Sequence, residues 1–249
     1  MTNQLLDVGP QPCNASTPNS GNCLNFKLYS VYYPATWPST PVPVLAWGNG
    51  TCAQPEGYGA LLRYIASQGF FIVAANCREV GSGAQMRRGL DFAAAANTNS
   101  ASPYYGHLDM SKAGIMGHSQ GSSGTAAAAS DSRVKAVILF NGGTSASKPF
   151  AVFTGDGDIS ATTPSALQTA VNGASKGAFF YYNNPVGAPT FGITGHLVLM
   201  LSPQRVTDQA TSFWQAVLNN DAAARAKFTG TSCAFCGHTG DYSFGQKGM

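Results

Sequence analysis

Charged residues are scarce in this chain. Only 10% of its 249 residues are Asp, Glu, Lys or Arg, well below the roughly 25% usual in globular proteins. The net charge of +3 is scattered, and the densest basic spot is Arg87-Arg88, which is too small for a nucleic-acid-binding surface. No apolar run reaches the roughly 18 uninterrupted residues that a membrane helix needs. We therefore expect no nucleic-acid partner and no membrane span.

The first residues of the chain, Met1–Gln4, contain no basic region, and no apolar region follows them. The chain nevertheless has six cysteines. An even number of cysteines in a charge-poor chain favours disulfides and an oxidising compartment. We expect a secreted protein whose signal peptide has been removed; the alternative is a protein that is never exported.

What the chain does contain is an alternation of strand and helix patterns. Strands are expected at 26–33, 42–47, 70–75, 112–116, 134–140, 150–154 and 178–182, and helices at 58–68, 84–97, 120–130, 163–171 and 203–219. Most of these strands are apolar on both faces, which predicts an α/β fold with a mainly parallel sheet flanked by helices. Length and pattern predict a single domain, 1–249, with an irregular N-terminal arm at 1–25 and a C-terminal extension at 221–249.

One five-residue segment, Gly117–Gly121, lies where an expected strand meets an expected helix, and it reads Gly-His-Ser-Gln-Gly. A serine on so sharp a turn has a strained backbone, and the residues two before and two after it must be very small. The turn raises Ser119 to the carboxyl edge of the sheet, where open α/β folds bind ligands. The alternative is a Gly/Ser-rich turn without chemistry. The strand–turn–helix context predicts a nucleophile elbow with Ser119 as the nucleophile.

A serine hydroxyl needs a base to take its proton near neutral pH. In α/β-hydrolases the acid and then the histidine follow the serine along the chain. Of the four histidines, His107 precedes the elbow and His118 lies inside it. His196 lies in a glycine-flanked loop between the last expected strand and the last helix, whereas His238 lies beyond that helix. We therefore predict His196 as the base.

The acid is expected at the tip of the strand 150–154, which is followed by Asp156 and Asp158. An acid there can accept a hydrogen bond from the imidazole Nδ1–H and fix its tautomer. We favour Asp158, which precedes an apolar residue and a helix start, and expect Asp156 to cap or solvate the turn. The spacings of 39 residues from Ser119 to Asp158 and 38 from there to His196 each fit one helix and one strand, so no large lid is expected.

Two backbone N–H groups are expected to form the oxyanion hole. That of Gln120 lies at the N-terminus of the helix after the elbow, where the helix dipole favours negative charge. The second should come from the loop 48–51 after the strand 42–47. Its glycines allow a substrate to approach closely, and we choose Thr51 as the donor.

The segments that surround these residues resemble a known family. Arg88–Phe92, Leu108–Gly121 and the helix-to-strand passage Ser67–Val73 are similar to α/β-hydrolases of the bacterial cutinase and polyethylene-terephthalate hydrolase group, and to chlorophyllase- and dienelactone-hydrolase-like proteins. The resemblance covers about residues 26–218. It implies an α/β-hydrolase fold and ester hydrolysis, and it places Thr51 at the oxyanion loop and Asp158 at the acid.

This chain departs from that group at two places. The polyesterases carry Met after the nucleophile, where Gln120 stands here, and a Trp in the loop that reads Phe140–Gly143 here. That Trp clamps aromatic substrates. The resemblance therefore supports ester hydrolysis more than hydrolysis of aromatic polyesters.

The cysteines suggest three disulfides. In the implied sheet Cys52 and Cys77 follow neighbouring parallel strands and are expected to pair. Cys13 would then pair with Cys23, and Cys233 with Cys236. Cys233-x-x-Cys236 with His238 is alternatively a zinc fragment or a redox pair, but no fourth ligand is near. We expect a structural disulfide, no metal and no cofactor.

Together these residues predict a carboxylic-ester hydrolase that works through an acyl-enzyme on Ser119, as a monomer, on a small-molecule or polymeric ester. A serine peptidase or thioesterase uses the same machinery and stays an alternative. A non-enzymatic binding protein on a hydrolase scaffold is the other alternative, although binding does not need Ser, Asp and His in this order.

Overall fold

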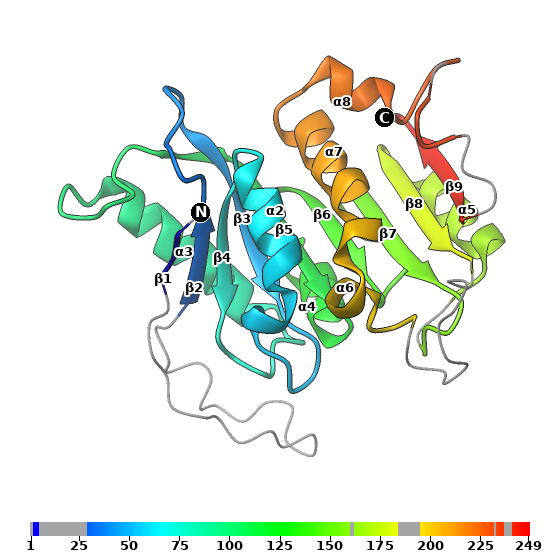
Figure 1. The fold of residues 1–249 in the computed structure, drawn as a ribbon, viewed down its shortest axis with the longest axis horizontal. Helices are drawn as coiled ribbons and strands as arrows, with labels where there is room; N and C mark the ends of the chain where they lie inside the picture. The colour runs from blue at the N-terminus through cyan, green and yellow to red at the C-terminus, as the bar shows by residue number, and fades with distance from the viewer. Residues whose placement is uncertain (1, 5–28, 160–161, 184–194, 232, 237–240) are drawn as a thin grey trace.

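A computed structural model describes residues 2–4, 29–159, 162–183, 195–231, 233–236 and 241–249. Its centre is one nine-stranded sheet with the order β1-β2-β4-β3-β5-β6-β7-β8-β9 (Figure 1). The strands are β1 (Thr2–Gln4), β2 (Tyr29–Tyr33), β3 (Val42–Gly48), β4 (Phe71–Ala75), β5 (Leu108–His118), β6 (Val134–Phe140), β7 (Phe150–Gly155), β8 (Gly177–Tyr182) and β9 (Tyr242–Lys247).

Six adjacent strands run parallel to one another, in the order β4, β3, β5, β6, β7 and β8. At the two sides the pairs β1–β2, β2–β4 and β8–β9 are antiparallel. Strands β3, β4 and β7 are buried along their whole length, as expected for parallel strands that are covered on both faces. The sheet flanked by helices is the α/β-hydrolase fold, which confirms the predicted fold class.

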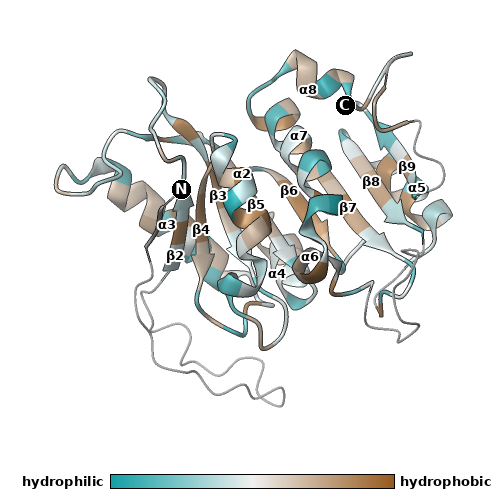
Figure 2. Ribbon diagram, in the orientation of Figure 1, coloured by the Kyte–Doolittle hydropathy of each residue, from teal (hydrophilic) through white to brown (hydrophobic). Residues whose placement is uncertain are grey.

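Helices cover both faces of the sheet. They are η1 (Pro55–Tyr58), α2 (Gly59–Ser67), α3 (Ala84–Thr98), α4 (Gln120–Ala128), α5 (Pro164–Gly173), α6 (Val198–Leu201), η2 (Pro203–Arg205), α7 (Thr207–Leu218) and α8 (Ala222–Ala226). The apolar sides of α2 and α7 pack on one face of the sheet, and those of α3, α4 and α5 pack on the other. The apolar strands between these layers are the brown arrows of Figure 2.

Local chemistry sets several of these boundaries. Leu61, Leu62 and Ile65 recur at helical spacing in α2 and are fully buried. The helix stops before Gly69, whose φ of +93° suits glycine far better than other residues. Thr163 caps the N-terminus of helix α5, because its side chain accepts a hydrogen bond from the Ala166 N–H.

The structure corrects the prediction at the termini and near the last helix. The arm 1–25 contains β1, and the extension 221–249 contains α8 and the edge strand β9. The expected helix 203–219 is divided into η2 and α7. β9 is only half-buried, and its sequence has no apolar run. Pairing with β8 rather than local pattern therefore makes it a strand.

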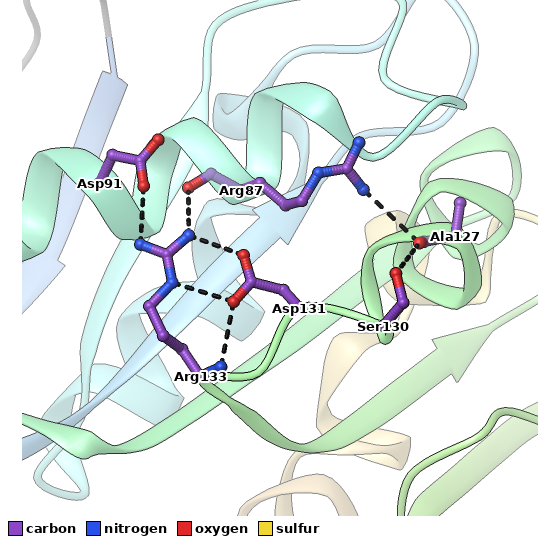
Figure 3. Close-up of polar contacts among 6 residues, drawn as sticks. All are labelled: Arg87, Asp91, Ala127, Ser130, Asp131 and Arg133. Atoms are coloured by element: carbon purple, nitrogen blue, oxygen red, sulfur yellow. Dashed lines mark hydrogen bonds and ion pairs between the residues drawn. The ribbon is translucent and has the colours of Figure 1, made fainter.

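An ion-pair cluster joins α3 to the turn before β6 (Figure 3). The Arg133 guanidinium lies 2.7 Å from a carboxylate oxygen of Asp91 and 2.7 Å from one of Asp131. It also donates to the Arg87 carbonyl. These hydrogen bonds from Arg133 lower the pKa of Asp131. The charge of Arg87 lowers this pKa further, so Arg87 belongs to a mixed-charge cluster.

Candidate active site

The elbow has the strained geometry that its sequence predicts. Ser119 has φ 54° and ψ −116° and lies between the end of β5 and the start of α4. A Cβ on Gly117 would lie 2.3 Å from the Gly121 carbonyl oxygen, and one on Gly121 would lie 2.1 Å from the Gly48 carbonyl oxygen. Both glycines are therefore required, and the β3 loop packs directly against the elbow.

The structure brings the predicted acid and base together. His196 Nδ1 lies 2.7 Å from Asp158 Oδ1. The other carboxylate oxygen, Oδ2, accepts hydrogen bonds from Thr154 Oγ1 at 2.6 Å and from Asn141 Nδ2 at 2.7 Å. The Asp158 side chain is fully buried. Because a carboxylate that only accepts faces Nδ1, the proton of a neutral His196 ring lies on Nδ1, and Nε2 keeps its lone pair.

Asp156, the alternative acid, lies elsewhere. Its Oδ1 accepts a hydrogen bond from the Tyr181 hydroxyl at 2.7 Å, and the residue is exposed. The structure thus pairs His196 with Asp158, which is the candidate that the sequence favours. His107 is far from the elbow in the sheet: it precedes β5 and stacks on Trp37 with ring centroids 4.5 Å apart. His238 lies outside the described residues.

Two contacts hold the His196 loop, one from the end of β6 and one from the elbow. Asn141 Nδ2 donates to the Gly195 carbonyl at 3.2 Å, and His118 Nε2 lies 2.6 Å from the His196 carbonyl oxygen. A Cβ on Gly195 would lie 2.1 Å from the Asp156 carbonyl oxygen, so this loop also packs tightly on the acid loop. In the described part of the chain Ser119 and His196 make no direct hydrogen bond; catalytic hydrogen bonds often tighten only in the complex with substrate.

The predicted oxyanion loop is held from within by Asn49. This residue is fully buried; its Oδ1 accepts from Trp47 Nε1 at 2.8 Å, and its Nδ2 donates to the Ala75 carbonyl at 2.7 Å. The N–H groups of Thr51 and Gln120 take no part in the backbone hydrogen bonds that hold the described loops and caps. They therefore remain able to donate to a substrate oxygen.

The Gln120 side chain, at the position of the family's methionine, turns toward the segment after β4. Its Nε2 donates to Glu79 Oε2 at 2.5 Å, and its Oε1 accepts from the Val80 N–H at 2.9 Å. Glu79 is buried, and its Oε1 has no partner within the described residues. Within the described residues, Gln120 is thus the side-chain donor that the buried Glu79 carboxylate has.

Replacing Gln120 with methionine is expected to lower the free energy of unfolding by about 1–3 kcal/mol, because the buried Glu79 carboxylate loses its donor and the Val80 N–H loses its acceptor. Urea unfolding measures the change. Gln68→Met is the matched control, since the Gln68 side chain is exposed. Equal effects of the two substitutions would contradict this role of Gln120.

His118 is a buried histidine with an unusual titration. Burial lowers its pKa from 6.5 to about 4, although the bond to the His196 carbonyl works in the opposite direction. In the folded protein the ring is therefore neutral at pH 7. Its tautomer is set by the His196 carbonyl, which only accepts, so that Nε2 carries the proton.

We expect the free energy of unfolding to fall when the pH is lowered from about 6.5 to about 4. In that window His118 is protonated in the unfolded chain but stays neutral in the folded protein. The loss from this group approaches about 3 kcal/mol. Urea unfolding at several pH values measures it, with His118→Gln as the comparison. The account is wrong if the variant, which lacks the imidazole, shows the same dependence on pH as the wild type.

Sequence reasoning missed the residues that hold the predicted ones in place. Asn141 is the clearest case, since it contacts both Asp158 and the Gly195 carbonyl. Its position at the carboxyl end of β6, at the same sheet edge as the acid, was the available signal. The contact between Tyr58 and His118 had no sequence signal.

The structure contains a Cys233–Cys236 disulfide, with Cα atoms 5.3 Å apart, as expected. Cys52 and Cys77 are disulfide-bonded too. Cys13 and Cys23 lie outside the described residues, so the connectivity of these four cysteines stays a prediction. Within the described ranges no cluster of His, Cys, Asp and Glu is suited to a metal ion, and no helix has the length and apolarity to cross a membrane.

The sheet, the elbow at its carboxyl edge and the helices on both faces define the class of this protein as an α/β-hydrolase. A sequence model of the PET hydrolase-like family matches residues 4–151, more than half of the chain, and the protein belongs to this family. Membership implies a serine ester hydrolase. No match is found among the curated proteins. The matched residues include Thr51 and the elbow, whereas Asp158 and His196 lie beyond them.

Proposed function

We propose that this protein is a carboxylic-ester hydrolase that acts through an acyl-enzyme on Ser119, with His196 as general base and Asp158 as the acid that orients it. The observation that carries the proposal is the buried Asp158–His196 pair, 2.7 Å apart, on loops that pack against a serine with a positive φ. A structural ion pair would not need a strained serine beside it, and such strain is typical of functional sites.

The proposed reaction has two halves. Ser119 Oγ attacks the ester carbonyl carbon while His196 Nε2 takes the hydroxyl proton. The Thr51 and Gln120 N–H groups stabilise the negative oxygen of the tetrahedral intermediate. When the intermediate collapses, His196 gives the proton to the departing alkoxide and the alcohol leaves. A water molecule, deprotonated by the same nitrogen, then hydrolyses the acyl-enzyme and restores Ser119.

The surface next to the proposed site supports an apolar ester. Exposed apolar patches mark binding sites for other molecules. Ile159 follows Asp158 in the chain and is 70% exposed, and Leu201, five residues after His196, is 65% exposed. Met200, which precedes Leu201, is 38% exposed. We therefore propose an ester with an apolar acyl or alcohol group, in a cutinase-like or polyesterase activity.

We also propose that residues 1–249 form one domain and that the protein is secreted. The single sheet that includes both β1 and β9 supports one domain. The Cys233–Cys236 disulfide and the disulfide-bonded Cys52 and Cys77 support an oxidising compartment, because such bonds are rare in the cytosol.

A panel of p-nitrophenyl esters from short to long acyl chains, with a polyester film and a peptide substrate beside it, tests this function. We expect hydrolysis of the esters at a kcat/KM at least about 100-fold above that of the peptide, and none above background in Ser119→Ala. Comparable kcat/KM for the peptide would favour a peptidase on the same residues. A folded wild-type protein without any esterase activity would overturn the proposal.

A further inference from the structure

A buried chain of hydrogen bonds runs behind the elbow, from the oxyanion loop to the His196 loop. The Gly50 N–H donates to the Tyr58 hydroxyl oxygen at 3.0 Å. That oxygen lies 2.9 Å from His118 Nδ1, and His118 Nε2 lies 2.6 Å from the His196 carbonyl oxygen. Tyr58 and His118 are 1% and 2% exposed, so water does not compete for these bonds.

The chemistry of the four groups gives every bond a direction. The carbonyl of His196 only accepts, so His118 Nε2 carries the proton. Burial lowers the pKa of His118 to about 4, and the neutral ring therefore has an acceptor at Nδ1. Burial also raises the pKa of Tyr58 to about 12, so its hydroxyl keeps its proton and donates it to Nδ1. The hydroxyl oxygen is then free to accept from Gly50.

The space around this chain leaves little room for movement. A Cβ on Gly50 would lie 2.8 Å from His118 Nδ1 and 3.0 Å from the Tyr58 hydroxyl oxygen. The His118 ring centroid lies 4.8 Å from that of His196 and 5.5 Å from that of Tyr58. The oxyanion loop, the elbow and the base loop thus meet on one imidazole.

Each end of the chain is next to a residue with a proposed catalytic role. Gly50 directly precedes Thr51, His118 directly precedes Ser119, and the bonded carbonyl belongs to His196 itself. A displacement of about 1 Å at reacting groups can cost roughly a hundredfold in rate. Bonds that fix these three loops against one another therefore bear directly on the rate.

We propose that Tyr58 and His118 are positioning residues, which hold the oxyanion loop and the base loop in register with the nucleophile through this hydrogen-bonded chain. The inference rests on the proposed ester hydrolysis at Ser119. Neither side chain needs to touch the substrate, so their loss is expected to lower kcat and leave KM nearly unchanged.

Tyr58→Phe removes only the hydroxyl and leaves the Gly50 N–H and His118 Nδ1 without partners. We expect kcat for a p-nitrophenyl ester to fall about tenfold or more, with KM within about twofold, because the change acts on geometry rather than on binding. The rate of fluorophosphonate labelling should fall by a similar factor. Tyr32→Phe is the matched control. Tyr32 is equally buried, but its hydroxyl donates to the Pro55 carbonyl, which is not part of this series of hydrogen bonds.

His118→Leu and His118→Gln separate positioning from packing. Leucine fills similar space without a donor, whereas glutamine can still donate to the His196 carbonyl. We expect the leucine variant to lose at least as much kcat as Tyr58→Phe, and the glutamine variant to recover part of it. The double variant Tyr58→Phe with His118→Leu should lose little more kcat than His118→Leu alone, because both substitutions interrupt the same series of hydrogen bonds.

The outcomes are distinguishable. If the wild type hydrolyses esters but Tyr58→Phe keeps the kcat of Tyr32→Phe, the chain is only structural and the inference is overturned. If glutamine and leucine at position 118 lose equal activity, packing rather than hydrogen bonding decides and the inference is again overturned. If the folded wild type neither hydrolyses esters nor reacts with the fluorophosphonate, the proposed function fails and this inference fails with it.

Discussion

Ser119→Ala is expected to lower kcat for ester hydrolysis about a million-fold, which leaves only the roughly thousandfold acceleration over water that the oxyanion hole and substrate binding supply. The substitution removes the one atom that forms the acyl-enzyme and leaves the oxyanion donors in place. Steady-state hydrolysis of a p-nitrophenyl ester measures the loss, and burst kinetics should vanish with it.

The fold should survive this change. Ser119 is only half-buried, and alanine keeps the Cβ that the elbow already accommodates. We expect the melting temperature to stay within a few degrees of the wild type, since a surface change of this kind costs roughly 0.5 kcal/mol or less. Ser123→Ala, an exposed serine one turn further along α4, is the matched control and should keep full activity. Retained hydrolysis in Ser119→Ala would exclude the acyl-enzyme mechanism.

Asp158→Asn is expected to lower kcat about ten-thousand-fold with little change in KM. In the wild type, Asp158 Oδ2 accepts hydrogen bonds from both Thr154 and Asn141. The amide nitrogen of an asparagine at this position is therefore directed away from these two donors and toward His196. An N–H facing Nδ1 would favour the tautomer that has its proton on Nε2. The base would then have no lone pair for the Ser119 proton.

Asp156→Asn tests the assignment of the acid with the same chemical change two residues away. Asp156 bonds to Tyr181 near the surface, and we expect this variant to keep kcat within about twofold, as an exposed substitution outside the site should. A large loss in Asp156→Asn with activity retained in Asp158→Asn would reverse the assignment.

The elbow could be predicted from sequence because its determinants are local. Gly117, Ser119 and Gly121 are contiguous with the strand and helix that make the turn, and steric exclusion acts within five residues. The core strands were predicted for a similar reason, since burial on both faces leaves a continuous apolar run. β9 lacks that signal because a half-buried edge strand depends on its partner.

The acid needed information that sequence spacing does not hold. Both Asp156 and Asp158 follow β7, and only the folded chain places Thr154 and Asn141 on one of them. Asn141 directly follows the neighbouring strand β6, so its contact depends on strand order and register rather than on local pattern. The chain from Gly50 through Tyr58 to His118 likewise joins residues 8 and 60 positions apart, and no periodicity encodes such a contact.

At both departures from the polyesterases, Gln120 and the loop after β6, side chains make hydrogen bonds that hold the site in place. Gln120 ties the elbow to the segment after β4 through Glu79 and Val80, where methionine has no hydrogen-bond donor. In the other loop, Asn141 stands just after the strand and braces the acid. Both positions thus serve the framework of the site in this chain.

The central claim, that Ser119 is the nucleophile of an ester hydrolase, is tested most directly by covalent labelling. The folded protein is incubated with a fluorophosphonate, and peptide mass spectrometry locates and counts the adduct. We expect one adduct per chain, on Ser119, formed in step with the loss of esterase activity and absent from Ser119→Ala. Activity lost without an adduct on Ser119, or an adduct on another residue that accounts for the loss, would contradict the claim.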